Sequence, residues 1–292
     1  GTAPEARVDG HDLRVTMVGH ATMLIQVAGL NILTDPVWSR RVSPVSFAGP
    51  KRVNAPGIAF DRLPDIDLVL LSHNHYDHLD IATLTRLHRH HRPQVVTPLG
   101  NDTIIHAAEP HMLVKTGDWG DVVDVGDAVR VHIEPCHHWS ARGSRDRRMA
   151  LWSAFVLETP AGLVYHIGDT GFHNGINYRK AHDKFGGFRL AILPVGAYEP
   201  RWFMKDHHQD PHEAVEGFEL CAAEHAIGHH WGTFQLTNEA VEDPLDRLAG
   251  ALAEKRIDAD RFRTLRPGES WDIPVASKTA SDTPQPAASG NL

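Results

Sequence analysis

The chain has 292 residues, of which 41% are hydrophobic and 23% are charged, and its formal net charge is −8 at pH 7. This composition supplies a sizeable hydrophobic core and excludes wholesale disorder, and no stretch reaches the apolar length of a membrane-spanning helix. The acidic balance argues against an extended nucleic-acid-binding surface, because such a surface needs clustered Lys and Arg. Two isolated cysteines, Cys136 and Cys221, predict free thiols in a reducing compartment rather than a disulfide framework.

Short strands alternate with helices along the chain. Apolar runs predict strands at residues 14–18, 22–27, 31–34, 68–71, 94–97, 121–125, 128–133, 154–158, 163–167 and 190–194. Tight turns are expected at Ala28-Gly29 and Gly126-Asp127. Helices are expected at residues 81–91, 101–108 and 211–223, the last with Asp210 as N-cap and Pro211 in its first turn. This alternation is typical of an α/β protein.

The two ends of the chain differ from its body. Residues 1–12 are expected to form an N-terminal extension, and the Ser/Ala/Pro/Thr-rich residues 276–292 a flexible tail. No other break in composition occurs, so residues 13–275 are expected to form a single domain. The first residues lack a signal-peptide core, which favours a cytoplasmic location. Because the chain does not begin with Met, an exported precursor is left open. A membrane-peripheral location is left open as well.

Residues 73–78 read His-Asn-His-Tyr-Asp-His and directly follow the apolar run that predicts the strand at 68–71. Proteins of the α/β class place ligands at the carboxyl ends of such strands. Alternate residues of extended backbone point the same way, so His73 and His75 can face one ion while Asp77 and His78 turn toward another. A chance group of surface histidines rarely has this spacing after a buried strand. The segment therefore predicts a metal site.

Three later segments place further donors just past apolar stretches, beside small residues that permit close backbone approach. These donors are His137 or His138, Asp169 within Gly-Asp-Thr-Gly, and His229 or His230. Each segment alone is a weak signal, and Gly-Asp-Thr-Gly could equally be a turn. Together with residues 73–78 they form a coherent ligand set. Most of the 22 histidines lack a companion at ligand spacing and are expected to be structural or surface residues.

The same motifs, in the same order, resemble those of the metallo-β-lactamase superfamily. They are residues 73–78, His138-Trp139, residues 168–171 and His230-Trp231-Gly232. The run Gly-Ala-Tyr-Glu-Pro-Arg-Trp-Phe-Met-Lys at 196–205 is most similar to N-acylphosphatidylethanolamine-hydrolysing phospholipase D and its bacterial relatives. Thr34-Asp35-Pro36, residues 49–52 and residues 231–234 add to this likeness, which covers roughly residues 13–273.

The resemblance implies a single-domain, four-layer αββα sandwich with a binuclear metal site. It assigns His73, His75 and His138 to one ion, Asp77, His78 and His230 to the other, and Asp169 to a bridge between them. His138 and His230 are preferred over His137 and His229 because the family's ligand immediately precedes Trp in both motifs. Imidazole and carboxylate donors suit two zinc ions, and iron or manganese would also fit.

Further residues are expected to orient the ligands, to assist catalysis or to bind the substrate. Asp35 is expected to orient a ligand histidine, with a simple turn before Pro36 as the alternative. Asp77 is a ligand that could also orient the attacking hydroxide, and His208 matches a family histidine near the substrate, where it could bind phosphate or transfer a proton. The aromatic loop at 198–204 suggests a pocket or a lipid-facing entrance, or packing under the sheet. The substrate candidates in this loop are Tyr198, Trp202 and the phosphate partner Arg201.

The expected function is that of a binuclear metal-dependent hydrolase, most similar to a phospholipase D-like phosphodiesterase, with a metal-bridging hydroxide as nucleophile. The alternative is hydrolysis of a soluble lactone or other ester at the same site. Redox chemistry at a di-iron centre is disfavoured because such relatives carry a carboxylate at the place of His75. The expected partner is a small molecule or lipid with a phosphodiester or ester group, and not a nucleic acid. Membrane association and homo-oligomer formation are left open.

Overall fold

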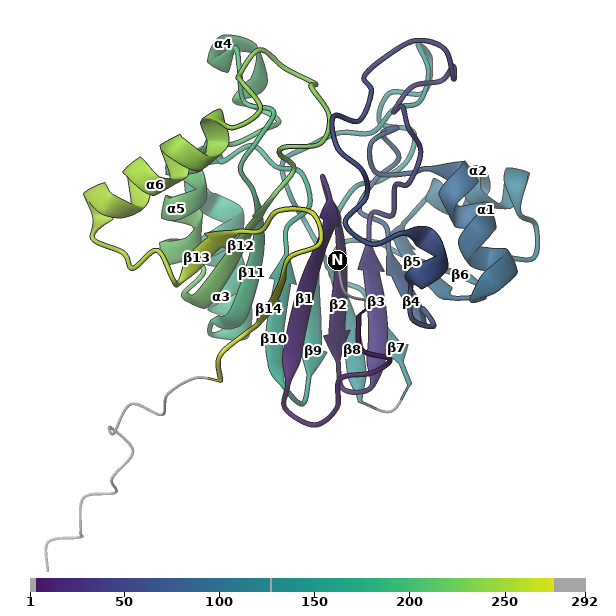
Figure 1. Ribbon diagram of the computed structural model, residues 1–292, viewed down its shortest axis with the longest axis horizontal. Helices are drawn as coiled ribbons and strands as arrows, with labels where there is room; N and C mark the ends of the chain where they lie inside the picture. Colours follow the sequence, from purple (N-terminus) through teal and green to yellow (C-terminus); the bar gives the residue numbers. More distant parts are fainter. Residues whose placement is uncertain (1–3, 127, 276–292) are drawn as a thin grey trace, which may run out of the picture.

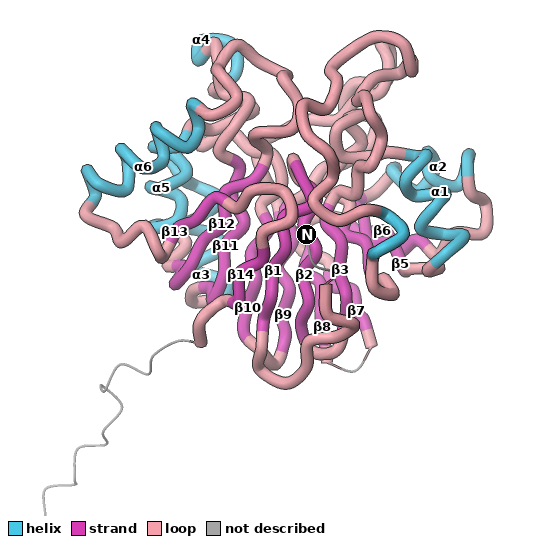
Figure 2. The backbone as a smooth tube through the Cα atoms, in the orientation of Figure 1, coloured by secondary structure: helices cyan, strands magenta, loops and turns pink. Residues whose placement is uncertain are grey.

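The computed structural model describes residues 4–126 and 128–275. Two seven-stranded sheets pack face to face, and helices cover both outer surfaces (Figures 1 and 2). The first sheet has the order β14 (Ser270–Asp272), β1 (Leu13–Gly19), β2 (Thr22–Val27), β3 (Leu30–Thr34), β4 (Leu68–Leu70), β5 (Gln94–Pro98) and β6 (Val114–Gly117). The second has the order β13 (Phe262–Thr264), β12 (Ala223–His229), β11 (Phe188–Pro194), β10 (Gly162–His166), β9 (Ala154–Thr159), β8 (Val129–Glu134) and β7 (Val122–Val125).

Three layers of buried apolar side chains hold these elements together. Residues from both sheets, such as Met17 and Phe155, form the central layer. The first sheet is covered by α1 (Ile81–His90) and α2 (Asn101–Ala108), and Leu84 of α1 packs onto it. The second is covered by α3 (Ile176–Phe185), α5 (Pro211–Leu220) and α6 (Asp243–Lys255), and Phe218 of α5 lies in that layer. The expected four-layer αββα sandwich is therefore confirmed.

The terminal strands make the sandwich one domain. Strand β13 joins the second sheet beside β12, and the chain then crosses so that β14 pairs with β1 of the first sheet. Arg14 Nε donates to Asp272 Oδ1 at 2.6 Å across this β1–β14 pair. Since the last strand completes the sheet that the first strand begins, the two sheets cannot separate into independent units.

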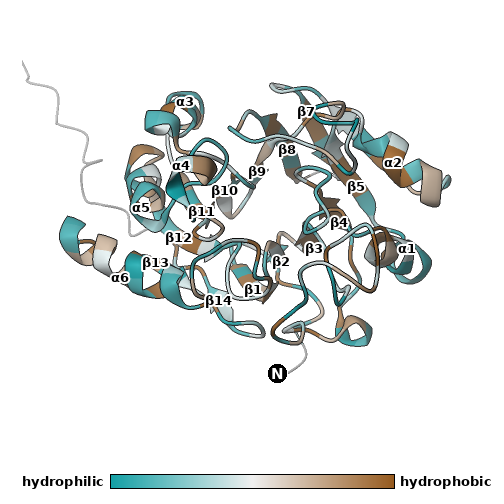
Figure 3. Cartoon of the chain, turned by 90° about the horizontal axis from the view of Figure 1, so that it is seen from above, coloured by the Kyte–Doolittle hydropathy of each residue, from teal (hydrophilic) through white to brown (hydrophobic). Residues whose placement is uncertain are grey.

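Parallel strands align their carboxyl ends at one edge of the sandwich. In the first sheet β3, β4, β5 and β6 run parallel, and in the second sheet β10, β11, β12 and β13 do so. Figure 3 looks down onto the strands and shows the two sheets facing each other beneath their connecting loops. Parallel strands end at a common edge, so side chains that follow them are brought together there.

Most of the expected elements are present. The helix expected at 101–108 has those bounds, the Ala28-Gly29 turn has the positive φ angles of 50° and 74°, and Asp210 accepts from Glu213 N as the N-cap of α5. The expectation that α5 reaches residue 223 is wrong: α5 ends at Leu220, and the left-handed φ of 52° at Ala222 turns the chain into β12. The tail at 276–292 and Asp127 of the expected Gly126-Asp127 turn lie outside the described residues.

Several elements have no counterpart in the sequence-based expectation. They are the seven-residue strand β12, the short edge strands β6, β13 and β14, the helices α3 and α6, the four-residue α4 (Arg201–Met204), and the short 3-10 turns at Phe60–Arg62 and His173–Gly175. Within the described residues, no helix combines the length and the apolar character that a membrane crossing requires.

We expect Ile192→Ala in β11 to lower the free energy of unfolding by about 2–5 kcal/mol, because Ile192 is fully buried between the sheets and its truncation leaves a cavity. Denaturant titration measures the loss. The control is Leu113→Ala, at a side chain that is 56% exposed, which should change stability by less than about 0.5 kcal/mol. Equal effects of the two substitutions would contradict the assignment of the central core.

Candidate metal centre

Side chains that could hold a metal follow the ends of strands in both sheets. They are His20 after β1, His73, His75, Asp77 and His78 after β4, His138 after β8, Asp169 after β10 and His230 after β12. The loop after β11 adds His208. These segments are far apart in sequence, but the common strand edge brings their side chains into one buried cluster.

The Oδ2 atom of Asp169 lies at the middle of this cluster. It is 3.1 Å from Nε2 of both His78 and His230, and 3.7 Å from Nε2 of His138. The Nε2 atoms of His208 and His73 are 3.9 and 4.0 Å away. Asp169 is 2% exposed, so these imidazoles rather than solvent surround its carboxylate.

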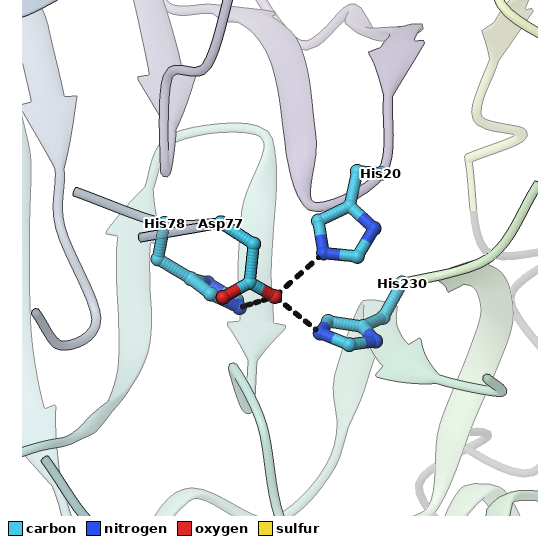
Figure 4. Close-up of side chains that lie close together, drawn as sticks. All are labelled: His20, Asp77, His78 and His230. Atoms are coloured by element: carbon cyan, nitrogen blue, oxygen red, sulfur yellow. Dashed lines mark hydrogen bonds and ion pairs between the residues drawn. The ribbon is translucent and has the colours of Figure 1, made fainter. Parts of the chain in front are cut away.

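Two groups of donors flank Asp169. In the first, Nδ1 of His75 lies 2.8 Å from Nε2 of His73 and 3.2 Å from Nε2 of His138. The second group surrounds Oδ2 of Asp77, which is 3.2 Å from Nε2 of His230 and 3.4 Å from Nε2 of His78 (Figure 4). The spacing of donors within each group is short enough for all of them to reach one common ion.

Hydrogen bonds on the far side of the rings fix their orientation. Nδ1 of His78 donates to Asp35 at 2.8 Å, and Nδ1 of His138 donates to the carbonyl of His207 at 3.0 Å. Nδ1 of His73 lies 2.9 Å from the Ser72 hydroxyl. Each contact leaves Nε2 directed at the cluster, which is the arrangement that orients metal-binding histidines.

The charges of the cluster favour a cation. Burial opposes ionisation of Asp169, but His230 and His78 outweigh it and hold the pKa of Asp169 well below its usual range. Burial also opposes charge on His230, yet the attraction of Asp169 and Asp77 raises its pKa to about 9. Burial lowers the pKa of His73, so that ring is neutral at pH 7. Carboxylates are therefore ionised in the cluster, as metal ligands must be.

Buried atoms without hydrogen bonds test whether a metal fits. Oδ1 of Asp169 is buried and makes no hydrogen bond within the described structure. Buried polar atoms are costly without a partner, and a divalent ion would satisfy such lone pairs. Imidazole and carboxylate donors without thiolate suit zinc, iron or manganese. The residues present therefore fit divalent metal ions.

His137 and His229, the sequence neighbours of the preferred ligands, point away from the donor groups. Nδ1 of His137 lies 3.0 Å from Nδ2 of Asn177, and its ring centroid is 4.0 Å from that of His173. His229 is fully buried, with its ring centroid 5.2 Å from that of His166. Neither ring belongs to the donor groups around Asp169.

The expected substrate residues of the 198–204 loop are engaged outside the cluster. Tyr198 is fully buried, and its hydroxyl donates to Asp243 of α6. Arg201 donates to Glu213 at 2.7 Å and to the carbonyl of His208 at 2.8 Å, so its guanidinium holds the loop that carries His208. Trp202 is 80% exposed. Substrate roles for these three residues remain predictions.

The sequence-based analysis missed His20. Its Nε2 atom donates to Asp77 Oδ2 at 2.9 Å, and its ring lies 4.1 Å from that of His230 (Figure 4). Burial lowers the pKa of His20 to about 4, so the ring is neutral at pH 7 and keeps one N–H for this bond. The signal was present, because Gly19-His20 is also a strong donor beside a small residue just past a strand.

Comparisons with known proteins agree with this geometry. The family model described as "Beta-lactamase superfamily domain" matches residues 30–231. The chain is similar to N-acyl-phosphatidylethanolamine-hydrolyzing phospholipase D 1 of Caenorhabditis elegans, with 39% identity over 89% of this chain and 76% of that protein. It is also similar to a metal-dependent hydrolase of Pyrobaculum islandicum, with 26% identity over 89% of this chain and 100% of that protein.

A solved structure shows the same fold. The metallo hydrolase Igni18 from Ignicoccus hospitalis superimposes with a TM-score of 0.65 and 18% identity, covering 90% of this chain and 99% of that one. At this identity the likeness establishes the architecture of the two proteins and nothing about their substrates.

We expect His20→Ala to weaken metal retention by about tenfold to a hundredfold, because the substitution removes the donor that orients the Asp77 carboxylate. The measurement is metal content per chain after dialysis against a competing chelator. His137→Ala is the matched control, since His137 adjoins His138 in sequence but its ring contacts Asn177 and His173. Metal retention in His20→Ala equal to that of the unmodified chain would refute this positioning role.

Proposed function

Because the chain belongs to the β-lactamase superfamily and is a metal-dependent hydrolase of that fold, we propose that it hydrolyses phosphodiesters at a binuclear metal centre, in the manner of a phospholipase D. The observation that carries this proposal is the presence of two donor groups on either side of one shared carboxylate oxygen, Asp169 Oδ2. The similarity to a phospholipase D that hydrolyses N-acyl-phosphatidylethanolamine supports a phosphodiester as the substrate class.

The ligand assignment follows the two groups. One ion would be held by His73, His75 and His138, and the other by Asp77, His78 and His230, with Asp169 between them. Two such ions, when bound, would supply a nucleophilic hydroxide at neutral pH and neutralise charge that develops on the phosphoryl oxygens. The protein itself contributes a buried site whose donors are already oriented.

Two residues have roles beside the ligands. His20 holds the Asp77 carboxylate through its Nε2–H, so Asp77 presents a fixed direction to its ion and to the attacking group. His208 is 8% exposed, and burial lowers the pKa of its ring to about 3, so it is neutral at pH 7. A neutral imidazole with Nε2 3.9 Å from Asp169 can donate a hydrogen bond to a phosphoryl oxygen beside the centre.

Purified protein should contain about two divalent ions per chain, and Asp169→Ala should lose metal and reduce kcat/KM by at least about a thousandfold. The substitution removes the oxygen shared by both donor groups. Elemental analysis and phosphodiesterase assays measure the two effects. Asp183→Ala, at an exposed carboxylate on α3, should change neither quantity. A metal-free protein with full activity would rule out the proposed centre.

The substrate class is tested with three compounds: bis(p-nitrophenyl) phosphate, an N-acylated phosphatidylethanolamine in mixed micelles, and an aliphatic lactone. We expect both phosphodiesters to be hydrolysed, with kcat/KM for the lactone lower by about a hundredfold, because the paired cations would match charge on a phosphoryl group. Preference for the lactone over both phosphodiesters would replace the phosphodiesterase proposal with an esterase on the same site.

A further inference from the structure

The most exposed apolar side chains gather around the metal centre. Phe47, Trp202 and Met149 are 81%, 80% and 77% exposed, which makes them the most exposed large hydrophobic residues in the described part of the chain. Phe203, beside Trp202 on α4, is 64% exposed. Isolated surface hydrophobics are common, but such residues concentrated around an active centre indicate an interaction surface.

These residues lie on three segments, at 36–60, 139–151 and 201–208, which we call the rim segments. In Figure 1, α4 and the dark blue loop of the first rim segment both rise above the strand ends. The second rim segment adjoins the donors directly, because the ring of Trp139 lies 4.5 Å from that of His75. Arg142 of this segment also donates to the carbonyl of Asn74 at 2.9 Å. The three rim segments, which carry the exposed apolar residues, therefore lie at the strand edge that holds the centre.

The rim segments are basic although the chain is acidic. They contain 10 of the 29 Lys and Arg but only two of the 37 Asp and Glu, namely Asp146 and Asp206, which gives them a formal charge of +8. The rest of the chain then holds 19 basic and 35 acidic side chains, a formal charge of −16. Positive charge is thus concentrated on the face that carries the exposed aromatic residues.

The rim cations are available to an external partner. Arg40, Lys51, Arg145, Arg148 and Lys205 are exposed, and none of them forms an ion pair with the described residues. Elsewhere many basic side chains are paired, as Arg14 is with Asp272 and Lys184 with Glu134. An anionic surface could therefore be bound without breaking existing ion pairs.

We propose that the rim segments dock the protein onto an anionic phospholipid bilayer, with Trp202, Phe203, Phe47 and Met149 inserted at the headgroup level and the rim cations against lipid phosphates. Aromatic side chains favour the membrane interface, and basic residues beside apolar ones add electrostatic attraction to anionic lipid. Docked in this way, the metal centre would face the membrane surface. This inference rests on the proposed function for its substrate, but binding itself needs no turnover.

Charge alone would also suit a nucleic acid, so the apolar residues decide between the two partners. Phosphate backbones are bound by Lys and Arg, and bases by stacking on flat rings. Met149 and the 38% exposed Val45 offer no ring for stacking, whereas a bilayer interface accommodates aliphatic and aromatic groups equally. The combination of exposed apolar side chains and unpaired cations in the rim segments therefore favours lipid.

The test is co-sedimentation of the full chain with vesicles. We expect binding to vesicles of phosphatidylcholine with about one quarter phosphatidylglycerol, and binding at least about tenfold weaker to pure phosphatidylcholine. Trp202→Ala/Phe203→Ala and, separately, Arg145→Glu/Arg148→Glu should each weaken binding to the anionic vesicles by about tenfold. The inactive Asp169→Ala variant should bind as well as the unmodified chain, so that loss of the proposed activity and loss of docking are distinguished.

Matched control variants truncate exposed apolar side chains or reverse exposed charges outside the rim segments. Leu113→Ala/Val275→Ala truncates two residues that are 56% and 65% exposed, and Arg89→Glu/Lys180→Glu reverses two exposed charges on α1 and α3. Both control variants should retain full vesicle binding. The proposal is overturned if no anionic vesicle is bound, if the control variants lose as much binding as the rim variants, or if a single-stranded oligonucleotide binds more tightly than the vesicles at equal phosphate concentration.

Discussion

One buried carboxylate oxygen, Oδ2 of Asp169, sets the main constraint on this fold. Imidazole nitrogens of five histidines lie within 4.0 Å of it: His73, His78, His138, His208 and His230. A buried charge is tolerated only when opposite charge or hydrogen-bond donors surround it. Segments after β4, β8, β10, β11 and β12 must therefore end within a few Å of each other, which the common edge of the two sheets provides.

The backbone around this oxygen is held in uncommon conformations. Positive φ angles of 58°, 37° and 63° occur at His20, Asp35 and His230, where residues other than glycine rarely adopt them. At Gly196 a Cβ atom would lie 2.1 Å from the carbonyl oxygen of His230, so only glycine lets β11 end this close to the His230 loop. These strained conformations fix the positions of the donor side chains, because a loop that could relax would not keep the imidazole rings aligned.

Local patterns in the sequence were enough to predict part of this arrangement. Residues 73–78 follow a buried strand within one short segment, so their spacing could be interpreted from the sequence alone. The position of His20 beside Gly19 is only a weak signal, because its partner Asp77 is 57 residues away and the contact exists only once β1 and β4 lie in one sheet. The three-residue strands β13 and β14 were missed for a related reason, since their hydrogen-bonding partners are distant in sequence. The assignment of ligands to ions depended on family resemblance and not on spacing.

Net charge describes this molecule poorly because charge is distributed unevenly over it. The value of −8 is the sum of an acidic body and a basic rim around the metal centre. Electrostatic attraction acts over roughly a Debye length, about 8 Å at physiological ionic strength, so an approaching phosphate group meets the charge of the rim before that of the body. The acidic body then opposes non-specific binding of anions on other faces, while the rim attracts them. Anionic groups are consequently attracted to the edge where the donors of both sheets converge.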